Sequence, residues 1–63
     1  MTEQEALELL TKIVELEAER PLSLARLAKQ SGKSMSTLLR DLATLETLGL
    51  VQRDGELVKT IRS

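Results

Sequence analysis

Three kinds of side chain are missing from this chain of 63 residues: cysteine, histidine and every aromatic. Without cysteine there is no disulfide bond and no thiolate zinc site, and without histidine there is no imidazole base. The core must therefore be built from aliphatic side chains, chiefly the fourteen leucines. Such a composition favours packed helices over a sandwich of sheets.

Long apolar runs are also missing. No run approaches the roughly 20 residues that span a bilayer, and the N-terminal TEQEALELL is acidic where a signal peptide would be basic. We therefore expect a soluble, cytoplasmic protein with no membrane partner. The length predicts one domain, residues 1–63, which buries only about 60% of the surface that its unfolded chain exposes. Its stability should be marginal, and a partner would improve it.

Catalysis is not expected. A hydrolytic centre without histidine or cysteine needs a lysine base or a carboxylate pair in a pocket, and a domain of this size leaves little room for one. The letters SGKS at residues 31–34 match part of a phosphate-binding loop, but the upstream glycine and the preceding buried strand are absent. The sequence thus predicts a protein that is not an enzyme and that has no cofactor and no metal.

Charge is unevenly distributed along the chain, although the net charge is only −1. Residues 1–20 hold two basic and six acidic side chains, a balance of −4, whereas residues 21–63 hold seven basic and four acidic side chains, a balance of +3. An acidic helix joined to a mildly basic remainder can still turn one face towards phosphates. Net charge therefore does not exclude nucleic acid as a partner.

The chain is organised around residues 24–51. Ser23 is a good N-cap for a short helix that ends at Ser31, since Gly32 can adopt the positive φ that terminates a helix. A longer helix over 35–48 follows, capped by Ser34 or Ser36 and stopped by Gly49. Its buried positions recur every three or four residues, at Met35, Leu38, Leu42 and Leu45. Two helices joined in this way can present the second one to a DNA groove.

Two short β-prone runs follow Gly49 and flank Asp54-Gly55. Asp-Gly between such runs predicts a hairpin with a two-residue type I′ turn. Because the tip carries Asp54 and Glu56, we do not expect it to enter a minor groove. The expected fold is mainly α with a small β-hairpin: three helices plus a two-stranded wing.

These residues resemble the bacterial winged helix-turn-helix. Ala28, Gly32 and Leu38 fall on its small, turn and buried positions, and LLRDLATLETLGLV is similar to the (I/V)xRDLxxLExxGLV ending of the DeoR, IclR and MarR types. The resemblance covers residues 6–61 and implies operator binding by a dimer, with helix 35–48 in the major groove. It also implies that Leu22 forms a short strand beside the wing. The metabolite-sensing domain usual in those regulators is absent, so no small-molecule effector is expected.

The first helix begins at a capping box, Thr2 to Glu5, and should run to about Ala18. Its apolar residues cover more than half the circumference, whereas packing on one side of a small core needs about 100°. We expect the domain's own core to take Leu7, Leu10 and Val14. A homodimer across a two-fold axis would then bury the other strip, Leu9, Ile13 and Leu16. Alternatively, Ile61 and the chain's own end cover this second strip.

The polar side of helix 35–48 is the candidate DNA-reading face. Around Arg40 it carries small or hydroxylated side chains: Ser36, Thr37, Ala43, Thr44 and Thr47. A slim face of this kind can enter a major groove about 12 Å wide, and Arg40 can bridge O6 and N7 of guanine. Ser36, Thr37 and Thr44 are expected to contact bases or nearby phosphates. The expected contacts to the DNA backbone are Lys33, Arg53 and Lys29.

Other interpretations remain open. The same fold could serve as a protein-interaction module, an adaptor or antirepressor, as the acidic first helix and acidic hairpin tip favour. The polar face could also be ordinary solvated surface, with Arg40 paired to Asp41 or Glu46 in exposed ion pairs worth about 0–1 kcal/mol. In the DNA-binding interpretation Asp41 holds neighbouring backbone or an arginine, because it would repel phosphates.

Overall fold

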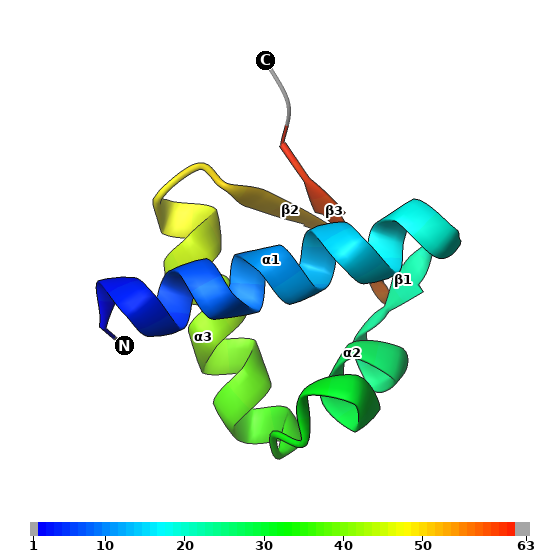
Figure 1. The fold of residues 1–63 in the computed structure, drawn as a ribbon, viewed down its shortest axis with the longest axis horizontal. Coiled ribbons are helices and arrows are strands. Elements are labelled where there is room, and N and C mark those ends of the chain that lie inside the picture. The colour runs from blue at the N-terminus through cyan, green and yellow to red at the C-terminus, as the bar shows by residue number, and fades with distance from the viewer. Residues whose placement is uncertain (1, 62–63) are drawn as a thin grey trace.

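Three helices and three strands follow one another in the computed structural model, which describes residues 2–61 (Figure 1). Their bounds are α1 Glu3–Glu19, β1 Leu22–Ser23, α2 Leu24–Ser31, α3 Met35–Thr47, β2 Val51–Asp54 and β3 Leu57–Thr60. The strands form one antiparallel sheet in the order β1-β3-β2. The described chain is thus mainly helical with a small sheet, as the sequence predicts.

Each helix starts where the sequence places a hydroxyl side chain. The hydroxyls of Thr2, Ser23 and Ser34 accept the backbone N–H groups of Glu5, Arg26 and Thr37 at 3.1, 3.1 and 3.4 Å. These bonds satisfy amides that have no partner within the first turn of a helix. The three predicted caps are confirmed, and Ser34 rather than Ser36 begins α3.

The sharp turn between α2 and α3 depends on Gly32, whose φ of 70° is in the left-handed region that glycine adopts at no steric cost. Its N–H donates to the carbonyl of Ala28 at 3.0 Å and closes α2. In Figure 1 the two helices diverge from this turn, with α1 lying across α3 and the sheet. The predicted end of the short helix at Gly32 is therefore confirmed.

The hairpin is present, but its turn is displaced by one residue from the predicted one. Asp54 pairs with Leu57, so the two loop residues are Gly55 and Glu56. Gly55 has φ 63°, and no described residue other than glycine has a positive φ, so the type I′ turn on Asp54-Gly55 is wrong. A glycine at the first loop position is typical of a type II′ turn. This register lets the Glu56 carbonyl accept the N–H of Leu24 at 2.8 Å, which fastens the tip to the start of α2.

The strand at Leu22 pairs with Val58, as the resemblance implies. It lies beside β3, so β3 is the middle strand and β2 is an edge. The core-facing side of the sheet buries Leu22, Val51 and Val58. α1 contacts β3, and α3 contacts β2, so both helices pack on this side.

The prediction of which strip of α1 faces the core is wrong. Its inner strip consists of Leu9, Ile13 and Leu16, which are buried with the leucines of α2 and α3. They belong to the domain's own core, so they cannot be the dimer interface, and Ile61 is not what covers them. The outer strip consists of Leu7, Leu10 and Val14; Leu7 is 56% exposed and Val14 is 40% exposed.

Polar contacts near the end of α1 explain this rotation. Glu17 lies on the arc between the two strips, and its carboxylate accepts the hydroxyl and the N–H of Thr60 at 2.7 and 3.3 Å. The Arg26 guanidinium donates to the carbonyl of Leu16 at 3.2 Å and pairs with Glu19 at 3.1 Å. These bonds orient α1 on β3 and α2, and apolar periodicity alone cannot supply that information.

The predicted burial of Met35 is also wrong, since 42% of its surface is exposed at the first position of α3. Leu38, Leu42 and Leu45 are buried as predicted, and α3 ends at Thr47 with Leu48 as its exposed cap. Within residues 2–61, every helix falls short of what crossing a membrane requires in length and apolar content.

Candidate nucleic-acid interface

The polar face of α3 is not covered by the described part of the chain. Ser36, Arg40, Ala43, Thr44 and Thr47 are exposed, and Thr37 is half-buried. The opposite side of the same helix buries its leucines against α1 and the sheet. The helix therefore presents a narrow polar ridge of small side chains with one long cation near its centre.

Arg40 has no ion pair and no side-chain hydrogen bond among the described residues. Its two candidate partners are not engaged with it: Asp41 pairs with Lys33 instead, with the carboxylate oxygen 3.2 Å from the ammonium, and Glu46 makes no ion pair in this part of the chain. The guanidinium therefore keeps its planar set of donors for another acceptor. Among the described residues, Arg40 therefore does not form the ion pair with Asp41 or Glu46 that the solvated-surface interpretation assigns to it.

Two of the hydroxyl groups around Arg40 donate hydrogen bonds to carbonyls of their own helix. Thr44 donates to the carbonyl of Arg40 at 3.3 Å, and Thr47 donates to that of Ala43 at 2.9 Å. Ser34 donates to the Thr37 hydroxyl at 3.0 Å. The hydroxyl hydrogens of Thr44 and Thr47 are therefore engaged, and their oxygens keep lone pairs that can accept hydrogen bonds.

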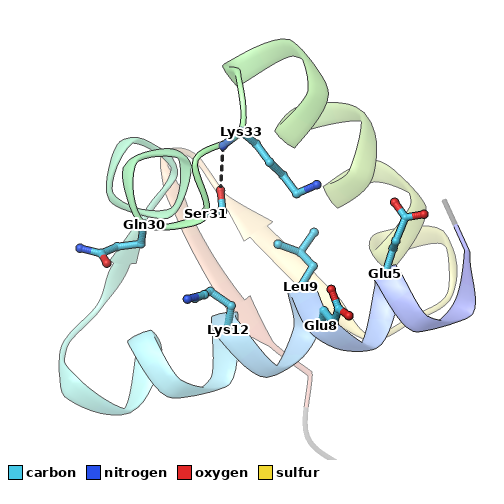
Figure 2. Close-up of a pocket in the computed structure, with 7 residues that line it drawn as sticks. All are labelled: Glu5, Glu8, Leu9, Lys12, Gln30, Ser31 and Lys33. Carbon is cyan, nitrogen blue, oxygen red and sulfur yellow. Dashed lines mark hydrogen bonds between the residues drawn. The ribbon is translucent and has the colours of Figure 1, made fainter.

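Lys33 does not lie on this ridge. Figure 2 shows its side chain reaching over α1, on the side of Glu5 and Glu8, and the ammonium forms the ion pair with Asp41. Both side chains are largely shielded, at 32% and 13% exposure. Asp41 is therefore held in an ion pair, but its partner is a lysine eight residues upstream and not the neighbouring backbone or the arginine of the prediction. A phosphate contact through Lys33, still a prediction, would compete with this pair.

The hollow in Figure 2 has a volume of about 310 Å³ and lies between α1 and the turn from α2 to α3. Its lining mixes Glu5 and Glu8 with Lys12 and Lys33. Within residues 2–61 no group of three or more carboxylates is arranged to hold a metal ion. The hollow therefore has neither a single sign of charge nor a set of metal ligands.

The remaining predicted contacts to the DNA backbone come from other elements. Lys29 is exposed in the last turn of α2, and Arg53 is exposed on the edge strand β2. By its register Arg53 lies opposite Val58, on the core-facing side of the sheet where α3 packs, whereas Lys59 pairs with Gln52 and faces the other way. Arg53 and Lys59 therefore cannot meet the same DNA backbone from one face of the hairpin.

The model of the HVO_A0114 family matches residues 1–62. No curated protein and no solved structure matches the chain.

Proposed function

The chain belongs to the HVO_A0114 family, and we propose that it binds double-stranded DNA sequence-specifically as a winged helix-turn-helix regulator of transcription. In this proposal α2 and α3 are the two helices of the motif, and β2 with β3 is the wing. α3 enters the major groove with its polar ridge. No catalysis, cofactor or small-molecule effector has a part in it.

The observation that carries the proposal is Arg40, which forms no ion pair within residues 2–61 and lies at the centre of a small-residue face of α3 that this part of the chain leaves uncovered. Guanidinium binds O6 and N7 of guanine through two parallel hydrogen bonds, and no other side chain on this ridge is long enough to rival that contact. Ser36 and Thr37 lie in the first turn, where backbone amides also favour a phosphate. Lys29 and Arg53 flank the groove and contact the DNA backbone.

Affinity would be low for a single subunit. The net charge is −1, and the Lys33 and Arg26 cations are already paired within the chain. Each phosphate contact contributes a slope of about −0.9 to the dependence of log affinity on log salt, so three or four contacts give weak binding at physiological salt. We therefore propose that two subunits bind a palindromic operator.

The test begins with selection of duplexes from a random pool, because the operator is unknown, followed by titration of a selected duplex. Arg40→Ala should weaken binding about 5- to 150-fold, the loss of one bidentate contact, and should relax the preference for guanine at one position. Lys59→Ala is the matched control, since it removes an exposed cation from the outer side of the hairpin. Equal loss in both variants, or no selected sequence, would contradict the proposal.

A protein-interaction module is the second candidate, and the acidic exposed side of α1 favours it. Glu5, Glu8 and Glu15 are exposed there and none of them forms an ion pair in the described chain. Such a surface repels phosphates and suits a basic protein partner. Under this alternative, binding to the partner survives Arg40→Ala and is lost when Glu5 and Glu8 are changed to Gln.

A further inference from the structure

Four of the five large apolar side chains exposed in the described chain gather on one face. Leu7 and Leu48 line a hollow of about 340 Å³ between α1 and the end of α3. Val14 and Ile61 line a second hollow, of about 410 Å³, between α1 and the end of β3. Leu10 and Leu50 line both, so the surfaces are continuous. We call this surface the apolar face; its members are Ala6, Leu7, Leu10, Val14, Leu48, Leu50 and Ile61.

Charge restricts what can cover the apolar face. Among the described residues, Glu3, in the first turn of α1, is the single charged side chain that lines its two hollows. Nucleic acid and anionic membranes are bound by lysine and arginine, and within residues 2–61 neither residue lines these hollows. The edges are hydroxylated, at Thr2, Thr44 and Thr60. The face therefore matches another uncharged, apolar protein surface.

We propose that this surface is the apolar face of a second copy of the chain, packed across a two-fold axis. Each copy carries both projecting side chains, such as Leu7 and Ile61, and hollows beside them, so the surface can be complementary to itself. In Figure 1 the end of β3 and the turn after α3 lie on the same side of α1.

A dimer through the apolar face of so small a chain should be weak. Specific interfaces at the small end bury about 600 Å² per partner, roughly the largest apolar patch of a typical monomer. That area is about one-seventh of the 4273 Å² that this chain exposes. The face extends over residues 6–14 of α1 and over the ends of α3 and β3. A dimer that buries an area at the small end should form at micromolar rather than nanomolar concentration.

The inference rests on the proposed function in one respect, because operator binding needs two subunits. It also narrows that function. Thr44 lines the first hollow, so a second copy would lie against it and remove it from the DNA contacts. The part of α3 that reads DNA is then its N-terminal half, with Ser36, Thr37 and Arg40. N-terminal residues are the ones that a recognition helix commonly directs at base edges.

Sedimentation equilibrium without DNA tests the dimer. Leu7→Glu places a carboxylate on the apolar face and should raise the dimer dissociation constant at least about tenfold, because burying a charge opposite an apolar surface is unfavourable. Met35→Glu is the matched control, since Met35 is exposed to a similar degree but lies outside the face. Val14→Glu gives a second variant should Leu7→Glu fold poorly by circular dichroism.

A mixed sample of isotope-labelled and unlabelled chains locates the contact directly. Intermolecular NOEs should join the methyl groups of Leu7, Val14, Leu48 and Ile61. A wild-type monomer at about 1 mM, a dimer that Leu7→Glu and Val14→Glu leave intact, or NOEs from another surface would each overturn the inference. Shifts of these methyls on adding phosphatidylcholine vesicles to a monomer would assign the face to lipid and overturn it too.

The two proposals fail in different ways. A dimer that selects no duplex contradicts the proposed function and leaves the apolar face as a dimer interface. A monomer that binds one half-site through Arg40 contradicts the dimer and leaves the DNA-binding proposal standing.

Discussion

α1 carries two apolar strips that look alike in the sequence and behave differently in the structure. The inner strip, Leu9, Ile13 and Leu16, fills the core, whereas the outer strip, Leu7, Leu10 and Val14, borders the solvent. Both consist of aliphatic residues at helical spacing, so hydrophobicity does not decide between them. A few long-range polar bonds, chiefly those of Glu17 and Arg26, accompany the observed rotation of this amphipathic helix.

The largest predicted loss of stability comes from a substitution in the inner strip of α1. Ile13→Ala should lower the free energy of unfolding by about 2–5 kcal/mol, because it leaves a cavity in a fully buried site. Leu7→Ala should change it by no more than about 0.5 kcal/mol in the monomer. Urea titrations at nanomolar protein concentration, below the range in which the proposed dimer forms, measure both without a contribution from association.

For a domain this small, Ile13→Ala can remove most of the stability, so Ile13→Val, with an expected loss of about 0.5–1.5 kcal/mol, keeps the experiment quantitative. Comparable losses for Leu7→Ala and Ile13→Ala would show that the two strips are not distinguished in solution.

The second predicted loss of stability concerns Glu17, which joins α1 to β3 through its bonds to Thr60. Glu17→Ala should cost about 1–2 kcal/mol, because the Thr60 N–H and hydroxyl lose a charged acceptor at a half-buried position. Glu15→Ala, at an exposed position of the same helix, is the control and should change stability by about 0.5 kcal/mol at most. Thermal and urea unfolding followed by circular dichroism give both values. Identical effects would mean that Glu17 has no part in orienting the helix.

The smallest predicted loss of stability comes from Ser34, whose hydroxyl caps α3, and it is compared with Ser36, whose hydroxyl does not. Ser34→Ala should cost about 1 kcal/mol, because the Thr37 N–H loses its acceptor at the start of α3. Ser36→Ala removes no bond to a backbone amide in the described chain and should be close to neutral in stability. Hydrogen exchange at the Thr37 amide separates the variants, and faster exchange in Ser36→Ala alone would reverse the assignment of the cap.

Local signals explain what the sequence could predict. Thr2, Ser23 and Ser34 bond to amides three residues away, and Gly32 and Gly55 take positive φ within their own turns. Such features depend on neighbours in the chain, so periodicity and capping rules find the helices and the hairpin. The exposure of Arg40 was predictable for the same reason, since it lies opposite the leucines of its own helix.

The errors came from contacts between distant residues. The Glu17 carboxylate bonds to Thr60, and the Glu56 carbonyl bonds to Leu24. Local periodicity indicates neither bond. The Glu17–Thr60 bond is found together with the unpredicted orientation of α1, and the Glu56–Leu24 bond is found together with the shifted turn. The ion pair of Lys33 with Asp41 depends on how α2 and α3 meet, so the sequence indicated two independent charges where the structure has a bonded pair.

The strand order has a consequence for how the chain acquires its shape during synthesis. Because β3, Leu57–Thr60, lies between β1 and β2, the last of the three described strands to be translated is the one that the other two require. The helices can form as they emerge from the ribosome, but their apolar sides have no finished surface to rest on until Thr60 is available. We therefore expect folding to be a late, all-or-none event, in which chains stalled before β3 stay open and exposed to proteases.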